Sequence, residues 1–300
     1  MSFINNALVR ITEILPKSVV KQFSKKYIAG ESLEQAISVV KMFNQNGIVT
    51  TIDVLGEAIK NEKESIESKE KCIKVLDAIL ENKLNSYLSV KPTQMGLSIN
   101  EEFALSQIEE LVNKAKSFDN FVRLDMEDSP YTQKTINVYK KLKQNHNNVG
   151  IVLQAYLKRT YDDVVDLCKE NSNIRLCKGI YVEPESISYK DKQAVRDNFI
   201  KCLEHILKSG SYVGIATHDE YLINKSYELL NKLNIDKNIF EFQMLLGVRE
   251  DLRDKINSDG YKLRVYVPFG KDWYAYSIRR LKENPQVARY IFNSIFGVRS

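Results

Sequence analysis

The sequence predicts an α/β protein whose parallel strands close into a (βα)₈ barrel. Eight short runs rich in apolar and β-branched residues recur along the 300 residues, and segments with helical periodicity separate them. Strands that alternate with helices pair in parallel, and eight such repeats close naturally into a barrel. The repeats extend over roughly 250 residues, which is the usual size of this fold.

The eight expected strands follow one another at the spacing of βα units. Each is short and mostly apolar, as strands buried on both faces are. They cover residues 48–55, 87–92, 121–126, 149–156, 174–181, 212–217, 239–245 and 263–268.

Helices are expected between these strands because apolar residues recur there every three or four positions. The clearest helical segments are 101–117, 130–144, 161–170 and 194–210. The segment 60–71 ("KNEKESIESKEK") consists mainly of charged residues, so we expect it to form a charged, solvated helix.

No linker rich in Pro, Gly or Ser divides the chain. We therefore expect one barrel over residues 46–300 and, before it, a helical segment over residues 1–45 that packs on the barrel. In the N-terminal segment four apolar residues lie about one helical turn apart: Ile4, Leu8, Ile11 and Leu15. Such a stripe is typical of a helix packed on its own domain, and the alternative is a helix that lies in a membrane interface.

Composition and charge narrow the possible classes of protein. The net charge of +5 is small and evenly spread, which argues against binding to nucleic acid. The mean hydropathy is −0.33, and no apolar run approaches the ~20 residues that cross a bilayer. The N-terminus lacks the features of a signal peptide. The four cysteines lack the spacing of metal ligands, so we expect no metal site and reduced thiols in a cytoplasm.

Polar residues stand near the carboxyl ends of nearly all the expected strands. In a (βα)₈ barrel these ends form the face that carries the active site, so a polar site in the mouth of the barrel is expected. The residues concerned are Lys91, Asp125, Gln154, Tyr156, Arg175, Lys178, Thr217, His218, Asp219, Glu241, Gln243 and Tyr266.

The segment 276–283 ("YSIRRLKE") follows the last expected strand. At about 100° per residue, Tyr276, Arg279, Arg280 and Glu283 share one face of a helix. Adjacent arginines suit bidentate binding of a carboxylate or phosphate, which favours an anionic ligand. The alternative is an ordinary solvated, charged helix face.

Short sequence motifs distinguish several classes of enzyme. The sequence contains no GxGxxG, P-loop, GxSxG or HExxH motif, which argues against Rossmann, nucleotide-hydrolysing, serine-hydrolase and zincin enzymes. Gly179 in "KGIY" would let the backbone approach a cofactor closely.

Two alternative functions stay open at this point. One is a lysine-dependent barrel lyase or aldolase in which Lys91 or Lys178 forms a Schiff base with an anionic substrate. The other is a non-catalytic barrel that binds an anion.

Nine segments, taken in order, resemble the flavin-dependent proline dehydrogenases of the monofunctional bacterial type. They are "TTIDVLGEA" (50–58), "SVKPTQMG" (89–96), "VRLDMEDS" (122–129), "VLQAYLKRT" (152–160), "IRLCKGIY" (174–181), "GIATHDE" (214–220), "FEFQMLLG" (240–247), "RVYVPFG" (264–270) and "YSIRRLKEN" (276–284). The resemblance implies a distorted (βα)₈ barrel that holds FAD. It also implies oxidation of L-proline to Δ1-pyrroline-5-carboxylate, the first step of proline catabolism to glutamate. In that reaction a hydride passes from proline C5 to flavin N5, and a membrane quinone reoxidises the flavin.

The resemblance also assigns the substrate site. Arg279 and Arg280 bind the proline carboxylate with Lys91, and anchoring at two points turns C5 toward the flavin. Tyr276 and Glu283 orient the arginines or close the pocket. Leu245 is assigned to the substrate site as well. Asp125, Arg175 and Tyr266 match the family's catalytic residues, and Tyr266 lies beside the substrate ring.

For the flavin site, the resemblance implies a set of residues drawn from four strand ends. The set is Met126, Gln154, Arg175, Cys177, Lys178, Gly179, Ile180, Thr217 and His218. A cationic Arg175 would stabilise the anionic reduced flavin. This chain departs from the family at Ile180, where "KGAY" is usual, and the branched side chain could crowd the flavin or narrow the pocket.

The location follows from the expected electron acceptor. With no expected transmembrane span, a protein that reduces a membrane quinone has to meet it at the bilayer surface. We therefore expect a cytoplasmic protein that attaches peripherally to the inner face of the cytoplasmic membrane, through basic or amphipathic surface.

Overall fold

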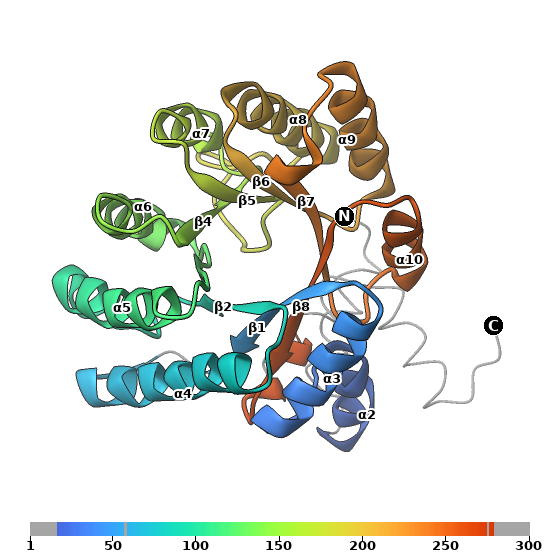
Figure 1. Cartoon of the computed structure of the whole chain (residues 1–300). Helices are drawn as coiled ribbons and strands as arrows, with labels where there is room; N and C mark the ends of the chain where they lie inside the picture. Colours follow the sequence, from blue (N-terminus) through green and yellow to red (C-terminus); the bar gives the residue numbers. More distant parts are fainter. Residues whose placement is uncertain (1–16, 57–58, 275, 279–300) are drawn as a thin grey trace.

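The computed structural model describes residues 17–56, 59–274 and 276–278 of the chain. In these residues, eight strands form a closed barrel in which each strand pairs in parallel with the next and β8 pairs with β1 (Figure 1). The strands are β1 (Val49–Val54), β2 (Ser86–Val90), β3 (Val122–Leu124), β4 (Val149–Gln154), β5 (Asn173–Cys177), β6 (Tyr212–Ala216), β7 (Phe240–Leu245) and β8 (Leu263–Phe269). The predicted (βα)₈ barrel is confirmed.

The fifth strand is shorter than its sequence suggested. The apolar run was expected to continue to residue 181, whereas β5 ends at Cys177. Gly179 adopts a φ of 101°, which lies outside the extended region and turns the chain away from the barrel. Residues 178–181 therefore form a turn at the barrel mouth.

Helices surround the barrel as an outer ring (Figure 1). They pack on the strands through apolar faces, and a single large hydrophobic core runs between the two layers. The elements are α4 (Glu62–Glu81), α5 (Glu101–Lys116), α6 (Ser129–Lys143), α7 (Thr160–Cys168), α8 (Lys192–Ser209), α9 (Glu220–Lys232), the short 3₁₀ helix η1 (Lys237–Ile239) and α10 (Glu250–Ser258).

The helix α4 corrects one expectation about the charged segment 60–71. Asn61 caps the helix by accepting a hydrogen bond from the backbone N–H of Glu64, and the helix continues to Glu81. Within the charged segment itself, Ser65 and Lys69 are buried. The segment is the first half of an amphipathic helix that packs on the barrel, and it is solvated on one side only.

Two helices precede the first strand, α2 (Lys17–Tyr27) and α3 (Leu33–Gln45). α3 packs against β8 and β1, at the place in the ring where a helix following β8 would otherwise lie (Figure 1). The apolar stripe expected at Ile4, Leu8, Ile11 and Leu15 lies outside the described residues. The division into an N-terminal segment over 1–45 and a barrel over 46–300 remains a prediction.

The interior of the barrel is polar below its mouth. Tyr87 on β2, Arg123 on β3, Glu241 on β7 and Arg264 on β8 are all buried. Tyr87 bonds to residues of β5 and β7, which do not neighbour β2 in the barrel, so these contacts cross the interior. Barrel interiors are more often filled by branched apolar side chains, which makes this polar layer unusual.

Candidate active site

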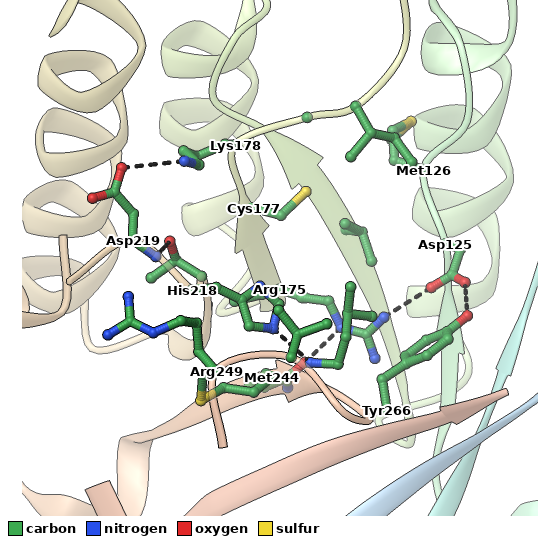
Figure 2. A pocket seen from close by; sticks show the side chains of 18 of the residues that line it. Asp125, Met126, Arg175, Cys177, Lys178, His218, Asp219, Met244, Arg249 and Tyr266 are labelled. Atoms are coloured by element: carbon green, nitrogen blue, oxygen red, sulfur yellow. Dashed lines mark hydrogen bonds and ion pairs between the residues drawn. The ribbon is translucent and has the colours of Figure 1, made fainter. Parts of the chain in front are cut away.

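A cavity of about 870 Å³ opens at the carboxyl ends of the strands. Its volume lies in the upper part of the range for pockets that bind small molecules and cofactors, roughly 300–1,000 Å³. Figure 2 shows the side chains that surround it, with Asp125 and Tyr266 on one side and Lys178, Asp219 and Arg249 on the other.

Most of the residues predicted from the sequence line this cavity. They are Lys91, Asp125, Met126, Arg175, Cys177, Lys178, Gly179, Ile180, Thr217, His218, Leu245, Tyr266 and Tyr276. Gln154 does not line it: the side chain is buried, and its Nε2 donates to the carbonyl oxygen of Glu127 at 2.8 Å. Arg279, Arg280 and Glu283 lie outside the described residues. The roles assigned to all these residues remain predictions.

Asp125 is the centre of a hydrogen-bonded cluster at the floor of the cavity. Its Oδ1 accepts from Ser89 Oγ at 2.6 Å and from Arg175 Nη1 at 2.9 Å, and its Oδ2 accepts from Tyr266 Oη at 2.7 Å. Burial alone would raise the pKa of Asp125, but Arg175 and Lys91 outweigh burial and hold that pKa below its ordinary value. Asp125 is therefore a carboxylate at neutral pH.

Tyr266 keeps its proton at neutral pH. Burial and the charge of Asp125 raise the pKa of this phenol well above 10. Its hydroxyl is thus fixed as a donor to Asp125. The ring also lies 5.3 Å from the guanidinium carbon of Arg175, within the range of a cation–π contact.

Arg175 joins the cavity to the polar layer below it. Besides Asp125, its Nε donates to Gln243 Oε1 at 2.6 Å and its Nη2 to Tyr87 Oη at 3.4 Å. Burial alone would lower the pKa of Arg175, but Tyr87 and Asp125 outweigh burial and raise it, so the guanidinium is charged throughout the neutral range.

Lys91 is held by a carboxylate that the sequence analysis did not select. Its Nζ lies 2.7 Å from Asp53 Oδ1 and 3.8 Å from Asp125 Oδ2. Asp53 on β1 is buried, and burial raises its pKa. The sequence does contain a sign of this role, because an Asp interrupts the apolar run "TTIDVL". The run by itself predicts only a strand.

The Gly179 turn is packed closely against an aromatic ring. A Cβ at this position would come within 2.0 Å of Tyr156 Cδ1, and the φ of 101° is strained for any other residue. Gly179 is therefore the residue that this turn requires, and Lys178, Gly179 and Ile180 all line the cavity.

The opposite side of the cavity carries cations. Lys178 and Arg196 both bind Asp219, with Arg196 in a bidentate arrangement at 2.9 and 2.7 Å. Burial alone would raise the pKa of Asp219, but these cations lower it to about 2. Lys192 and Arg249 line the same side. The sequence analysis missed Lys192, Arg196 and Arg249, because they belong to helix starts and loops and do not lie on strand ends.

Two further contacts define the polar groups of the site. His218 Nε2 accepts a hydrogen bond from the backbone N–H of Leu245 at 2.8 Å, which places the proton of the neutral ring on Nδ1.

Glu127 lines the cavity and is held by the backbone N–H and hydroxyl of Thr93, at 2.9 and 2.6 Å. Burial raises the pKa of Glu127. It follows Asp125 and Met126 directly, in a motif that the sequence analysis quoted without giving Glu127 a role.

A search of the described helices finds no segment with the length and apolar character that crossing a membrane requires.

Comparison with known proteins identifies the family. The proline dehydrogenase family model matches residues 36–291. Proline dehydrogenase 1 of Bacillus subtilis (strain 168) is 38% identical over 272 residues, which cover 91% of this chain and 90% of that protein. The proline dehydrogenase of Deinococcus radiodurans is 35% identical over 284 residues, covering 93% of this chain and 92% of that protein.

A solved structure agrees with the sequence relatives. Proline utilization A from Bdellovibrio bacteriovorus, inactivated by N-propargylglycine, superimposes with a TM-score of 0.83 at 26% identity. The match covers 88% of this chain but 33% of that one, so this chain spans about a third of the larger protein. With the fold, the cavity and these matches together, the chain belongs to the proline dehydrogenase family.

Proposed function

We propose that the chain binds FAD and oxidises L-proline to Δ1-pyrroline-5-carboxylate, with a quinone as the final electron acceptor. The observation that carries this proposal is the cluster of Asp125, Arg175, Tyr266 and Lys91 at the floor of the cavity. It supplies fixed charges and a fixed hydroxyl at one end of a cavity that extends to a cationic side.

The residues present fit a flavin dinucleotide. The turn of Lys178, Gly179 and Ile180 lines the cavity, and at Gly179 only backbone is available to a ligand. Four cations on the far side suit the two phosphates of a dinucleotide: Lys178, Lys192, Arg196 and Arg249. Arg249 adopts a left-handed backbone conformation with φ 48°, which is uncommon for a residue other than glycine. Strained residues of this kind often occur at ligand sites.

When bound, FAD supplies the two-electron acceptor that the side chains of this protein lack. The protein's own contribution is to bind and orient. Arg175 brings a permanent positive charge to the cavity, and His218, held through Nε2 by the backbone N–H of Leu245, forms part of the cavity wall. Tyr266 and Asp125 hold each other in place, so the ring of Tyr266 is a rigid surface against which a substrate ring can pack.

Substrate orientation is proposed to depend on the carboxylate of proline. Arg279 and Arg280, which lie beyond the described residues, bind it with help from Lys91. The reacting C5 lies across the ring from that carboxylate, so fixing one end sets the position of the other. Tyr276, which precedes Arg279 by three positions in the sequence, is buried and lines the cavity.

The Schiff-base alternative is not favoured by the surroundings of the lysines. A nucleophilic lysine has to be a neutral amine, which requires desolvation or a neighbouring cation. Lys91 instead lies 2.7 Å from Asp53 Oδ1 and 3.8 Å from Asp125 Oδ2, so its nearest charged partners among the described residues are acidic and not cationic. Lys178 is likewise bound to the carboxylate of Asp219.

A product assay tests the proposal. Purified protein is incubated with L-proline and a short-chain quinone, and the cyclic imine is trapped with o-aminobenzaldehyde. We expect one imine for each quinone reduced, since proline loses a hydride and a proton while the quinone gains two electrons and two protons. The Asp125→Asn variant should lose most of this activity, and the surface variant Asp77→Asn is the matched control.

Two outcomes of this assay would contradict the proposal. One is the absence of imine with every quinone or dye acceptor, although the protein contains flavin. The other is a covalent adduct at Lys91 or Lys178 after borohydride treatment with a carbonyl substrate, which would instead favour the lyase.

Delivery of electrons to a quinone is proposed to occur at a membrane surface in the cytoplasm. We expect peripheral attachment to anionic lipid that weakens as salt screens the interaction. Co-sedimentation with anionic and neutral vesicles at two salt concentrations measures this. Equal, negligible sedimentation in all four conditions would point to a soluble acceptor instead.

A further inference from the structure

Tyr87 places a phenol in the polar layer below the cavity. Its oxygen accepts hydrogen bonds from Arg175 Nη2 at 3.4 Å and from Gln243 Nε2 at 3.3 Å. The guanidinium carbon of Arg264 lies 3.8 Å from the centroid of its ring, and that of Arg123 lies 5.9 Å from it. The phenol is thus surrounded by hydrogen-bond donors and positive charge.

The orientation of Gln243 leaves the Tyr87 hydroxyl without an acceptor. Gln243 Oε1 faces Arg175 Nε, which can only donate, at 2.6 Å. Gln243 Nε2 faces Glu241 Oε1, which as a carboxylate can only accept, at 2.7 Å. The amide cannot be flipped without losing both bonds, so Nε2 also faces Tyr87. Among the described residues, both hydrogen bonds of Tyr87 Oη are ones that it accepts.

Two of the three guanidiniums around Tyr87 have carboxylate partners. Arg264 Nε lies 2.6 Å from Glu241 Oε1, and Arg175 Nη1 lies 2.9 Å from Asp125 Oδ1. Lys91 pairs with Asp53, so among the described residues Asp125 and Glu241 balance Arg175 and Arg264, and neither carboxylate is left to balance a further cation.

The third guanidinium, Arg123, is buried among neutral groups. Its Nη1 donates to the backbone carbonyls of Ile151 and Asn173, at 3.0 and 2.7 Å, and its Nε has no hydrogen-bond partner among the described residues. Arginine keeps its charge inside proteins. Among the described residues, the layer therefore carries one buried positive charge that no carboxylate balances, and Tyr87 is the acidic group whose charge favours the cationic form of Arg123 most strongly.

The balance of these effects favours the ionised phenol. Burial alone would raise the pKa of Tyr87, but Arg264, Arg123 and Arg175 outweigh burial and the charge of Glu241. Together they lower the pKa of this phenol from 10 to about 7. Tyr212 on β6, near the same carboxylate, has its pKa raised by burial and keeps its proton.

We propose that Tyr87 is a buried phenolate at neutral to mildly alkaline pH, and that its charge positions Arg175 at the floor of the cavity. The phenolate accepts from both donors that face it and balances the unpaired charge of Arg123. Tyr87 acts through Arg175 and does not touch the cavity, so it is a positioning residue. The charge state of Tyr87 does not depend on the function proposed above, whereas its effect on the reaction does.

Carbon NMR of the full-length protein tests the charge state directly. Tyrosine labelled with ¹³C at the ring carbon that bears oxygen gives separate signals for phenol and phenolate. Of the 16 tyrosines in the chain, we expect one phenolate signal at pH 8 that moves to the phenol position with a midpoint near pH 7. It should vanish in Tyr87→Phe and persist in Tyr139→Phe, which removes another fully buried phenol. A parent spectrum with every tyrosine in the phenol form at pH 8 overturns the proposal, whether or not the variants fold.

Anaerobic reduction of the bound flavin by proline tests the positioning of Arg175. We expect the ratio of the parent rate to the Tyr87→Phe rate to rise several-fold between pH 6 and pH 8, with a midpoint near 7. The ratio of the parent to Tyr139→Phe should stay flat. If the ratio of the parent rate to the Tyr87→Phe rate does not change between pH 6 and pH 8, the proposal that Tyr87 positions Arg175 is overturned. A protein that proline does not reduce at all refutes the proposed function, while the NMR titration still decides the state of Tyr87.

Discussion

Replacing Tyr266 by Phe removes one hydroxyl from the floor of the cavity and leaves the ring in place. The hydroxyl donates to Asp125 Oδ2 at 2.7 Å, and the ring packs against Arg175. The lost hydrogen bond is made to a charged group, since Asp125 is ionised at neutral pH. Ser89 and Arg175 continue to bind the other oxygen of Asp125, so the carboxylate stays in position with one partner fewer.

The expected cost follows from the charge on the acceptor. Hydrogen bonds to charged groups contribute about 1.5–3 kcal/mol, so the free energy of unfolding should fall by that amount. At ~2.1 cal/mol/K of unfolding entropy per residue, the melting temperature of a chain of this length should fall by about 2–5 °C. The folded-state pKa of Asp125 is depressed, so this stability is present above its unfolded value of 3.8 and is lost as the pH falls through the folded value. The loss should therefore be the same at pH 5 and pH 8.

Urea unfolding of the parent and the variant at both pH values measures this effect. The matched control is Tyr139→Phe, in which the hydroxyl removed is also buried but has only neutral groups, Ser172 and the backbone of Asn173, as neighbours for hydrogen bonding. Its free energy of unfolding should fall by less than that of Tyr266→Phe, because a hydrogen bond between neutral groups contributes about 0.5–1.5 kcal/mol. The account of Asp125 fails if Tyr266→Phe costs no more than this control. It also fails if the cost disappears at pH 5, since that would mean a protonated carboxyl.

Three further predictions concern the proposed carboxylate site, the substrate preference and the buried Tyr87. Replacing Arg279 or Arg280 by Lys keeps the charge but removes the planar guanidinium that binds a carboxylate with two hydrogen bonds, so proline should bind more weakly with flavin content little changed. Parental affinity for proline in both variants would refute the assignment of these arginines to the proline carboxylate. Tyr266→Ser should lower kcat/KM for proline and reduce the preference for proline over trans-4-hydroxyproline, because a pocket contact of this kind discriminates roughly 10–200-fold. An unchanged ratio of the two kcat/KM values would point to Ile180 as the source of selectivity. The folded-state pKa of Tyr87 is depressed, so its stabilisation is complete above pH 10 and lost as the pH falls through about 7. Relative to Tyr87→Phe, the parent should thus gain up to ~1.4 kcal/mol per pH unit between those values in urea unfolding; a constant difference would contradict this.

The strands could be predicted because each is buried on both faces and so reads as a short apolar run. β2 and β4, for example, are buried at every position. The end of β5 differs from the prediction because Ile180 and Tyr181, which are common in strands, follow soon after Cys177, and only the backbone conformation of Gly179 reveals the turn. The burial of Ser65 and Lys69 in α4 was missed because it depends on the neighbouring helices and strands, which composition does not report.

The floor of the cavity was found from the sequence because strand ends converge in a barrel, whatever the details of packing. The pairs within it were not predictable. Asp53 on β1 reaches Lys91 only because β1 and β2 pair in the register that places Asp53 opposite Ser89. Similarly, Arg196 meets Lys178 at Asp219 through the packing of α8 on the barrel, which no local pattern encodes.

The absorption spectrum of the purified protein, recorded before and after addition of L-proline without oxygen, is the most direct test of flavin-dependent proline oxidation. We expect the two visible bands of an oxidised flavin, and their loss when proline is added. Addition of a quinone should then restore them. A protein that binds flavin in the cavity but keeps its oxidised spectrum with excess proline would contradict the proposed activity. A protein that cannot be loaded with flavin at all would contradict the cofactor site built from Gly179 and the four cations Lys178, Lys192, Arg196 and Arg249.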